Sequence, residues 1–305
     1  RKATAVQDPL LAKALVLSKD NTTLAIVAID LISIKAPVVD DIRDEIENRT
    51  GIPKDHIFVH ATHTHTGANV SEVKDKLPGQ VAEAVEKALK QRVSENKVAY
   101  GTAEEDSVAF IRRYLMKDGT VRTNPGRTNP DIVRPIGEID PTVHVLAFND
   151  AKTMLVSYGL HPDCVGGTQL TADYPYHLTE ALRDAVGEGW NVVYLNACCG
   201  NVNHINVNDP DQRSSYEESR RIGRKIAQAA QKAYRDAQPF SVDVLAAEAK
   251  EVRCPIREVP EDVYEWAKRQ MKADPEKASK RRFNERTPSR IIALAESEDE
   301  YHPSE

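Results

Sequence analysis

The apolar and polar positions of the first hundred residues follow the strand period and the helix period in turn. Short apolar, β-branched runs at 14–17 and 23–29 flank the polar residues 19–21, which predicts a β-hairpin. Residues 57–61 form a third apolar run of strand length, and it leads into a polar segment. The other elements expected in this part are helices over 38–48 and 80–93 and a strand over 97–101.

The centre of the chain departs from this alternation. Residues 117–141 are rich in Pro and Gly, which predicts a long loop, either ordered or disordered. Long loops inside compact domains are often functional. The elements expected after it are paired strands over 143–148 and 154–158, a helix over 176–185, a buried strand over 192–195, a helix over 215–235, a strand over 241–252 and a helix over 261–272.

Hairpins mixed with strand–helix–strand stretches are typical of α/β domains. We therefore predict an α/β fold with mixed β-sheets and flanking helices. After residue 258 the chain becomes polar and charged, so 259–305 is expected to be a separate, partly helical segment.

Composition narrows the class of protein. The chain has 305 residues, 40% hydrophobic and 29% charged, which is the balance of a globular protein and not of a disordered or fibrous one. Its formal net charge of -6 gives no general attraction to nucleic acid, so no nucleic-acid partner is expected. No apolar run reaches the roughly 18 residues of a membrane span, so no transmembrane segment is expected.

Histidines gather where the strand over 57–61 ends. His63 and His65 would point to the same side if the strand continued, since alternate residues of a strand share a face. Neutral imidazole nitrogen is a zinc ligand, so the pair is a plausible half of a zinc site. The alternative is a polar strand end whose histidines bond to the backbone.

Two further strand ends carry polar residues. His161 follows the apolar run 154–160 and precedes a proline, and the small polar segment 196–204 follows the buried strand over 192–195. Backbone N–H groups of such a segment can hold an oxyanion. The sequence has none of the motifs H-E-x-x-H, G-x-S-x-G, G-x-x-x-x-G-K-[ST] and G-x-G-x-x-G, which removes helix-borne metalloproteases, α/β-hydrolases, P-loop NTPases and the usual dinucleotide binders.

These three segments, in this order, resemble the neutral/alkaline ceramidase family, with similarity from about residue 8 to about residue 252. Residues 61–67 match the family motif A-T-H-T-H-[ST]-G at every position, and His161 with Pro162 matches its second strand-end histidine. Residues 200–205 correspond to its G-[DN]-x-S-P-N motif. The resemblance implies that residues 1–258 are a ceramidase-like catalytic domain.

The resemblance also implies an activity: zinc-dependent hydrolysis of a linear amide C–N bond, splitting ceramide into sphingosine and a fatty acid by metal-activated water. His63 and His161 would bind one Zn²⁺, and His65 would face the substrate amide. It further implies a small-molecule or lipid substrate, peripheral membrane contact, a role in sphingolipid metabolism, and a secreted or periplasmic location. The other expected site residues are Arg127, Asn203 and His204 in catalysis and Gly200, Asn201, Arg134 and Asp173 in substrate binding.

The sequence departs from the family in two places. Asn203 stands where the family has serine, followed by His204 and Ile205 in place of Pro and Asn; this leaves a mechanism based on metal-activated water but not one based on a serine nucleophile at that position. The Glu and Tyr that complete the family's zinc site have no counterpart before residue 305, so the chain is expected to be a fragment of a bacterial-type homologue. Two alternatives stay open: a metal-dependent hydrolase acting on a non-lipid amide, ester or sugar derivative, and a non-catalytic zinc- or ligand-binding homologue.

Overall fold

The computed structural model describes residues 2–250, 252–253, 255–256, 258–273 and 287–297. The chain divides into two compact units, residues 1–248 and residues 249–305. The first unit contains the strand ends that carry the histidines.

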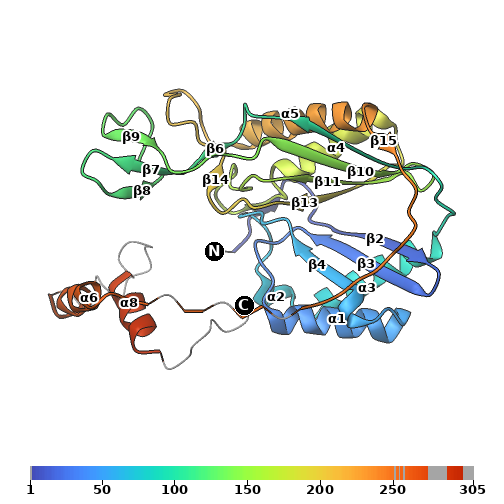
Figure 1. Ribbon diagram of the computed structural model, residues 1–305, viewed down its shortest axis with the longest axis horizontal. Helices are drawn as coiled ribbons and strands as arrows, with labels where there is room; N and C mark the ends of the chain where they lie inside the picture. The colour runs from blue at the N-terminus through green and yellow to red at the C-terminus, as the bar shows by residue number, and fades with distance from the viewer. Residues whose placement is uncertain (1, 251, 254, 257, 274–286, 298–305) are drawn as a thin grey trace. The chain divides into compact units, whose positions relative to one another are not determined.

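A three-stranded mixed sheet begins the first unit (Figure 1). Strands β2 (Ala12–Lys19) and β3 (Thr22–Ile29) form the expected antiparallel hairpin, and β4 (Ile57–Ala61) pairs with β3 in parallel. Helices α1 (Ala36–Thr50) and α3 (Leu77–Lys90) cover one face of this sheet, as predicted, through a core that contains Val27, Ile46 and Val81. The short helices between these elements are η1 (Lys54–His56) and α2 (Val70–Val73).

A five-stranded mixed sheet forms the other half of the unit, in the order β13-β11-β10-β5-β15. The expected pairing of 143–148 with 154–158 is confirmed as antiparallel strands β10 and β11, and the buried strand β13 lies parallel to β11. Helices α4 and α5 cover this sheet. The bounds are β5 (Val98–Glu104), β10 (Thr142–Phe148), β11 (Thr153–Tyr158), β13 (Asn191–Asn196), β15 (Gln238–Pro239), α4 (Tyr174–Val186) and α5 (Tyr216–Arg235).

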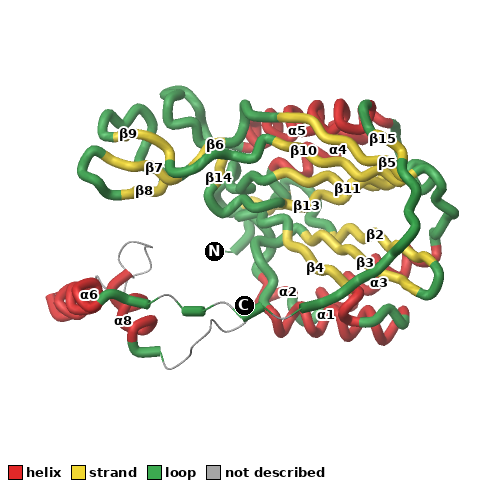
Figure 2. The backbone as a smooth tube through the Cα atoms, viewed as in Figure 1, coloured by secondary structure: helices red, strands yellow, loops and turns green. Residues whose placement is uncertain are grey.

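The two sheets face each other across a small apolar core. Leu15 of β2 packs there with Val98 of β5 and Phe148 of β10. The unit is therefore layered as helix, sheet, sheet and helix (Figure 2), and the prediction of an α/β fold with mixed sheets and flanking helices is confirmed. Because β3/β4 and β11/β13 are parallel pairs, the residues after β4, β11 and β13 leave the sheets at carboxyl ends, where open α/β sheets build their sites.

The Pro- and Gly-rich segment 117–141 is ordered and contains strands. β7 (Arg113–Met116) pairs on either side with β8 (Val121–Thr123) and β9 (Ile132–Pro135), and Val207 packs against this small sheet. The remaining short pairs are β6 (Phe110–Ile111) with β14 (Val202–Asn203) and β1 (Ala5–Val6) with β12 (Gln169–Leu170).

The chain beyond β15 lacks the strand expected over 241–252. The described residues there form no regular element, and Val244 is 77% exposed. Alternating polarity predicts a strand only where a partner strand supplies hydrogen bonds, and no described strand pairs with this segment. In the second unit, α6 (Glu261–Ala273) confirms the expected helix, and α8 (Thr287–Ala295) was not expected.

Across the described residues, the structure contains no helix with both the length and the apolar character needed to cross a bilayer.

Candidate metal centre

Two strand ends far apart in the sequence bring their histidines together. His63 follows β4 in one sheet, and His161 follows β11 in the other. Their Nε2 atoms lie 3.0 Å apart. His65 completes the group, since one ligand nitrogen of each of the three imidazoles lies within 4.8 Å of the others. Among the described residues, these three histidines are the group of metal-ligating side chains with such spacing.

Asn196, the last residue of β13, ties the two sheets together beside this cluster. Its backbone N–H donates to His60 Nε2 at 2.9 Å, and its side-chain Nδ2 donates to the carbonyl of Thr62 at 3.1 Å. The N–H of His65 donates to the carbonyl of Pro162 at 3.1 Å. These bonds explain why two separate strand ends hold a fixed distance. They also give His60 a structural partner outside the cluster.

Backbone carbonyls set the tautomers of both facing imidazoles. His63 Nδ1 lies 2.6 Å from the carbonyl of Ile32, and His161 Nδ1 lies 3.2 Å from that of Cys199. A carbonyl oxygen only accepts, so both Nδ1 atoms carry the proton and donate. Both Nε2 atoms then present lone pairs to each other at 3.0 Å. That arrangement repels unless a cation lies between or beside them, so this donor set fits a metal ion.

The backbone at His63 departs from the strand geometry expected for the motif. Its φ is +75°, in the left-handed region that a side chain with a Cβ seldom adopts. The expectation that His63 and His65 share a strand face is therefore replaced by a turn, in which their ring centroids lie 5.1 Å apart. Such strain persists where the surroundings enforce it, and it is frequent at functional sites.

Burial disfavours the charged form of two of the three imidazoles, those of His161 and His65. It lowers the pKa of His161 to about 4, a shift partly offset by the bond to the Cys199 carbonyl and the charge of Asp163. Burial likewise lowers the pKa of His65. Imidazole must be neutral to bind a metal, so these two side chains are in their ligating form near neutral pH.

Arg112 is the arginine whose charge acts on the cluster. After burial, its positive charge contributes to the lowered pKa of both His65 and His161. It lies between β6 and β7, where its N–H donates to the carbonyl of Asn201. Arg112 was not among the site residues expected from the sequence. The sequence signal for it is the pair of arginines that follows the apolar run 108–111.

The two arginines expected at the site lie in the region of 124–135. Arg127 is half-buried, and its Nε has no hydrogen-bond partner among the described residues. Arg134 is exposed and donates from Nη1 to the carbonyl of Pro135. No contact of either with the histidines is described, and their roles stay predictions.

Asn203 and His204 are both buried beside β14. Asn203 is 0% exposed and donates from Nδ2 to Asn124 Oδ1 at 2.9 Å. His204 lies 3.0 Å from Asp163 and 2.9 Å from Ser214, so both of its ring nitrogens have partners. Burial raises the pKa of Asp163, but the hydrogen bond and charge of His204, with the charges of His161 and His65, outweigh it and lower the pKa overall. The expected catalytic roles of Asn203 and His204 stay predictions.

The residues expected to bind substrate are scattered. Gly200 is exposed, and Asn201 donates from Nδ2 to the carbonyl of Ile136 while its Oδ1 is buried with no partner among the described residues. Asp173 is 0% exposed and caps α4: its carboxylate accepts from the N–H groups of Tyr174 and Val165. Burial raises its pKa. Substrate contact by these residues stays a prediction.

Known structures show where this fold occurs. The chain is similar to the crystal structure of neutral ceramidase from Pseudomonas aeruginosa, with a TM-score of 0.63 and 18% identity over 76% of this chain and 40% of that one. It is also similar to a ceramidase complexed with C2, with a TM-score of 0.61 and 18% identity over 77% of this chain and 40% of that one. The chain thus shares the ceramidase fold and spans about 40% of the length of these structures. No protein-family profile matches the sequence, and no curated protein matches it.

Proposed function

We propose that this protein is a zinc-dependent amidohydrolase of the neutral ceramidase type, which hydrolyses an N-acyl amide. The observation that carries the proposal is the pair of facing Nε2 atoms, 3.0 Å apart, from His63 and His161. Two properties support it: the A-T-H-T-H-T-G motif at 61–67 and the ceramidase fold of the unit that contains it.

In such a site, two of the histidines would bind the metal, and the third, with Arg112, would act on the substrate. His63 and His161 would hold the ion, each fixed by a bond from Nδ1 to a backbone carbonyl. When bound, zinc supplies Lewis-acid polarisation of the amide and activation of water. His65, the exposed member of the cluster, would donate a hydrogen bond or move a proton. Arg112 would stabilise negative charge that develops on the amide oxygen.

A second candidate is a related hydrolase that acts on a water-soluble amide or ester. Asn203 favours it, because this residue replaces the family serine and its amide is fully buried and bonded to Asn124. A substrate that depends on a hydroxyl at this position would find none. The metal chemistry of the histidine cluster is the same in both candidates.

The test is hydrolysis of two N-acyl substrates, a ceramide and a short water-soluble N-acyl amine, by the zinc-loaded protein. We expect turnover of the ceramide that falls by at least about 100-fold in His63→Ala and in His161→Ala. His144→Ala is the matched control, since this histidine bonds to Tyr100 and lies outside the cluster.

Removal of the metal separates the outcomes. Chelation should abolish hydrolysis, and added zinc should restore it. Turnover of the soluble amide alone would select the second candidate. Full hydrolysis by chelator-treated protein would overturn both.

A further inference from the structure

A hydrogen-bonded chain of three side chains joins the half-buried carboxylate of Asp163 to the exposed hydroxyl of Ser214 through the buried imidazole of His204. Asp163 Oδ1 lies 3.0 Å from His204 Nδ1, and Ser214 Oγ lies 2.9 Å from His204 Nε2. His204 is 1% exposed, whereas Ser214 is exposed. The base is shielded from water and the hydroxyl is accessible.

The order of the atoms fixes which group donates. A carboxylate only accepts, so His204 Nδ1 carries the proton and donates it to Asp163. Nε2 then accepts the hydroxyl hydrogen of Ser214. This is the sequence of bonds, Asp to Nδ1 and Nε2 to Ser, that activates serine in hydrolases of unrelated folds.

Gln212 links the backbone of His204 to helix α5. Its Nε2 donates to the backbone carbonyl of His204 at 2.7 Å and to Glu218 of α5 at 3.0 Å. Its Oε1 accepts from the N–H of Asn206 at 2.8 Å. Ser215, next to Ser214, caps α5 by accepting from the N–H of Glu218. The serine is therefore fixed at the start of a helix whose first N–H groups favour negative charge nearby.

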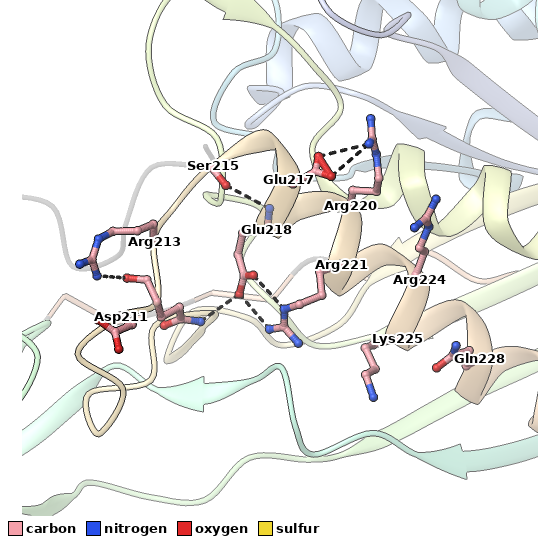
Figure 3. A pocket seen from close by; sticks show the side chains of 11 residues that line it. Asp211, Arg213, Ser215, Glu217, Glu218, Arg220, Arg221, Arg224, Lys225 and Gln228 are labelled. Carbon is pink, nitrogen blue, oxygen red and sulfur yellow. Dashed lines mark hydrogen bonds and ion pairs between the residues drawn. The ribbon is translucent and has the colours of Figure 1, made fainter.

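A basic pocket of about 500 Å³ begins beside this serine, lined by both of its chain neighbours, Arg213 and Ser215 (Figure 3). Five basic and three acidic side chains line it, which leaves a formal excess of two positive charges. Two of the acidic groups are paired within the pocket, Glu217 with Arg220 and Glu218 with Arg221. Arg224 and Lys225 also line the pocket (Figure 3), and among the described residues neither forms an ion pair with its acidic groups, so both are placed to bind an anion.

We infer that Ser214 is the nucleophile of a second hydrolytic site, with His204 as its general base and Asp163 as the group that orients His204, and that this site takes small esters bearing a negative charge. In the first step, Oγ bonds to the carbonyl carbon while its proton passes to His204 Nε2. The ester C–O bond then breaks, and the alcohol leaves with that proton. Water hydrolyses the acyl-serine in the same way and restores the hydroxyl.

The first experiment is labelling with a fluorophosphonate, using the chelator-treated protein so that the histidine cluster holds no metal. Oγ would bond to phosphorus, fluoride would leave, and the serine proton would pass to His204. Intact mass and peptide mapping should find one label, on Ser214. The label should vanish in Ser214→Ala, which changes an exposed residue and whose fold is checked by circular dichroism, and the rate should fall at least about 100-fold in His204→Gln.

The matched control is Ser71→Ala, which removes an exposed serine that has no histidine partner in the described structure and should label as the wild type does. An absence of label on Ser214 in the wild type would overturn the inference. So would a labelling rate that His204→Gln leaves unchanged, because Ser214 would then react without a base.

The charge preference has its own test with two chromogenic esters, 4-nitrophenyl hemisuccinate and the neutral 4-nitrophenyl butyrate. The anionic ester should have a kcat/KM at least about 10-fold higher. Arg224→Gln should lower the kcat/KM of the anionic ester to about that of the neutral ester, because the pocket then lacks one of the two cationic groups placed to bind an anion. Equal kcat/KM values for the two esters in the wild type would exclude the basic pocket as the substrate site.

Discussion

At the scale of single residues, burial decides the charge of the histidines. His177 of α4 shows this most simply, because it lies apart from the metal cluster. It is 7% exposed, its Nε2 has no hydrogen-bond partner among the described residues, and its ring packs on those of Tyr176 and Tyr216. Burial lowers its pKa to about 4, and the charges of Arg220 and Arg224 add to this against an opposing effect of Glu217.

This shift predicts a specific loss of stability in acid. Unfolded His177 takes up a proton near its ordinary pKa of 6.5, and the folded residue does so only near 4. The stability that neutral His177 contributes is therefore complete above pH 6.5 and is lost as the pH falls toward 4. At about pH 5 the loss is about 2 kcal/mol, since each pKa unit corresponds to about 1.4 kcal/mol.

Urea unfolding at about pH 7.5 and about pH 5 measures this effect in wild type and in His177→Gln, whose amide does not titrate. The free energy of unfolding should drop less between the two pH values in the variant. An equal drop in both proteins would contradict the assignment, because other buried histidines are unchanged between them.

The sequence drew attention to the three histidines that the structure groups together, and it did so for a physical reason. A motif names residues that are adjacent in the chain, such as His63 and His65, and a strand end marks His161. It does not name Arg112, whose charge reaches the cluster only because β6 pairs with β14. His204 and Asp173 were also expected to be site residues. Their hydrogen-bond partners, Ser214 for His204 and the first turn of α4 for Asp173, are visible only in the folded structure.

At the scale of elements, the helices are fixed by close approach as well as by apolar faces. α4 and α5 pack so tightly that a Cβ built on Gly223 would lie 2.6 Å from His177 Cβ and 2.7 Å from the backbone of Leu178. Alanine in a helix is ordinarily about 1 kcal/mol better than glycine. At Gly223 packing should reverse that preference.

Gly223→Ala should therefore lower the free energy of unfolding by about 1 to 3 kcal/mol. The matched control is Gly79→Ala in α3, where a new Cβ meets only the guanidinium end of Arg49, in ordinary van der Waals contact at 3.4 Å. That change should be neutral or stabilising by up to about 0.5 kcal/mol. Urea unfolding of both variants checks the pair, and a stabilising Gly223→Ala would contradict the packing described.

Elements were predictable where local pattern and tertiary environment agree. The β2–β3 hairpin and the amphipathic α5 are examples, and Ser215 with Glu218 even marks the start of α5 as a helix-capping pair. The prediction of a strand over 241–252 was wrong, because alternating polarity does not show whether a neighbouring strand is present to pair with it. β8 and β9 were missed because Pro and Gly obscured short strands whose pairing depends on β7.

At the scale of the molecule, two sheets stack and meet at one site. The hairpin sheet supplies His63 and His65, and the larger sheet supplies His161. A metal held by both would join the two layers that the Leu15, Val98 and Phe148 core also joins. An ion that binds only the folded chain stabilises it in proportion to the logarithm of its concentration over Kd. Zinc binding should therefore raise the free energy of unfolding of this two-sheet unit.

The most direct measurement is the zinc content of the purified protein after equilibration with zinc and removal of free metal. The account predicts about one zinc per chain, lost in His161→Ala and retained in His144→Ala, with far-UV circular dichroism unchanged in both. Wild-type protein that retains no zinc, or a zinc content that His161→Ala leaves unchanged, would contradict it.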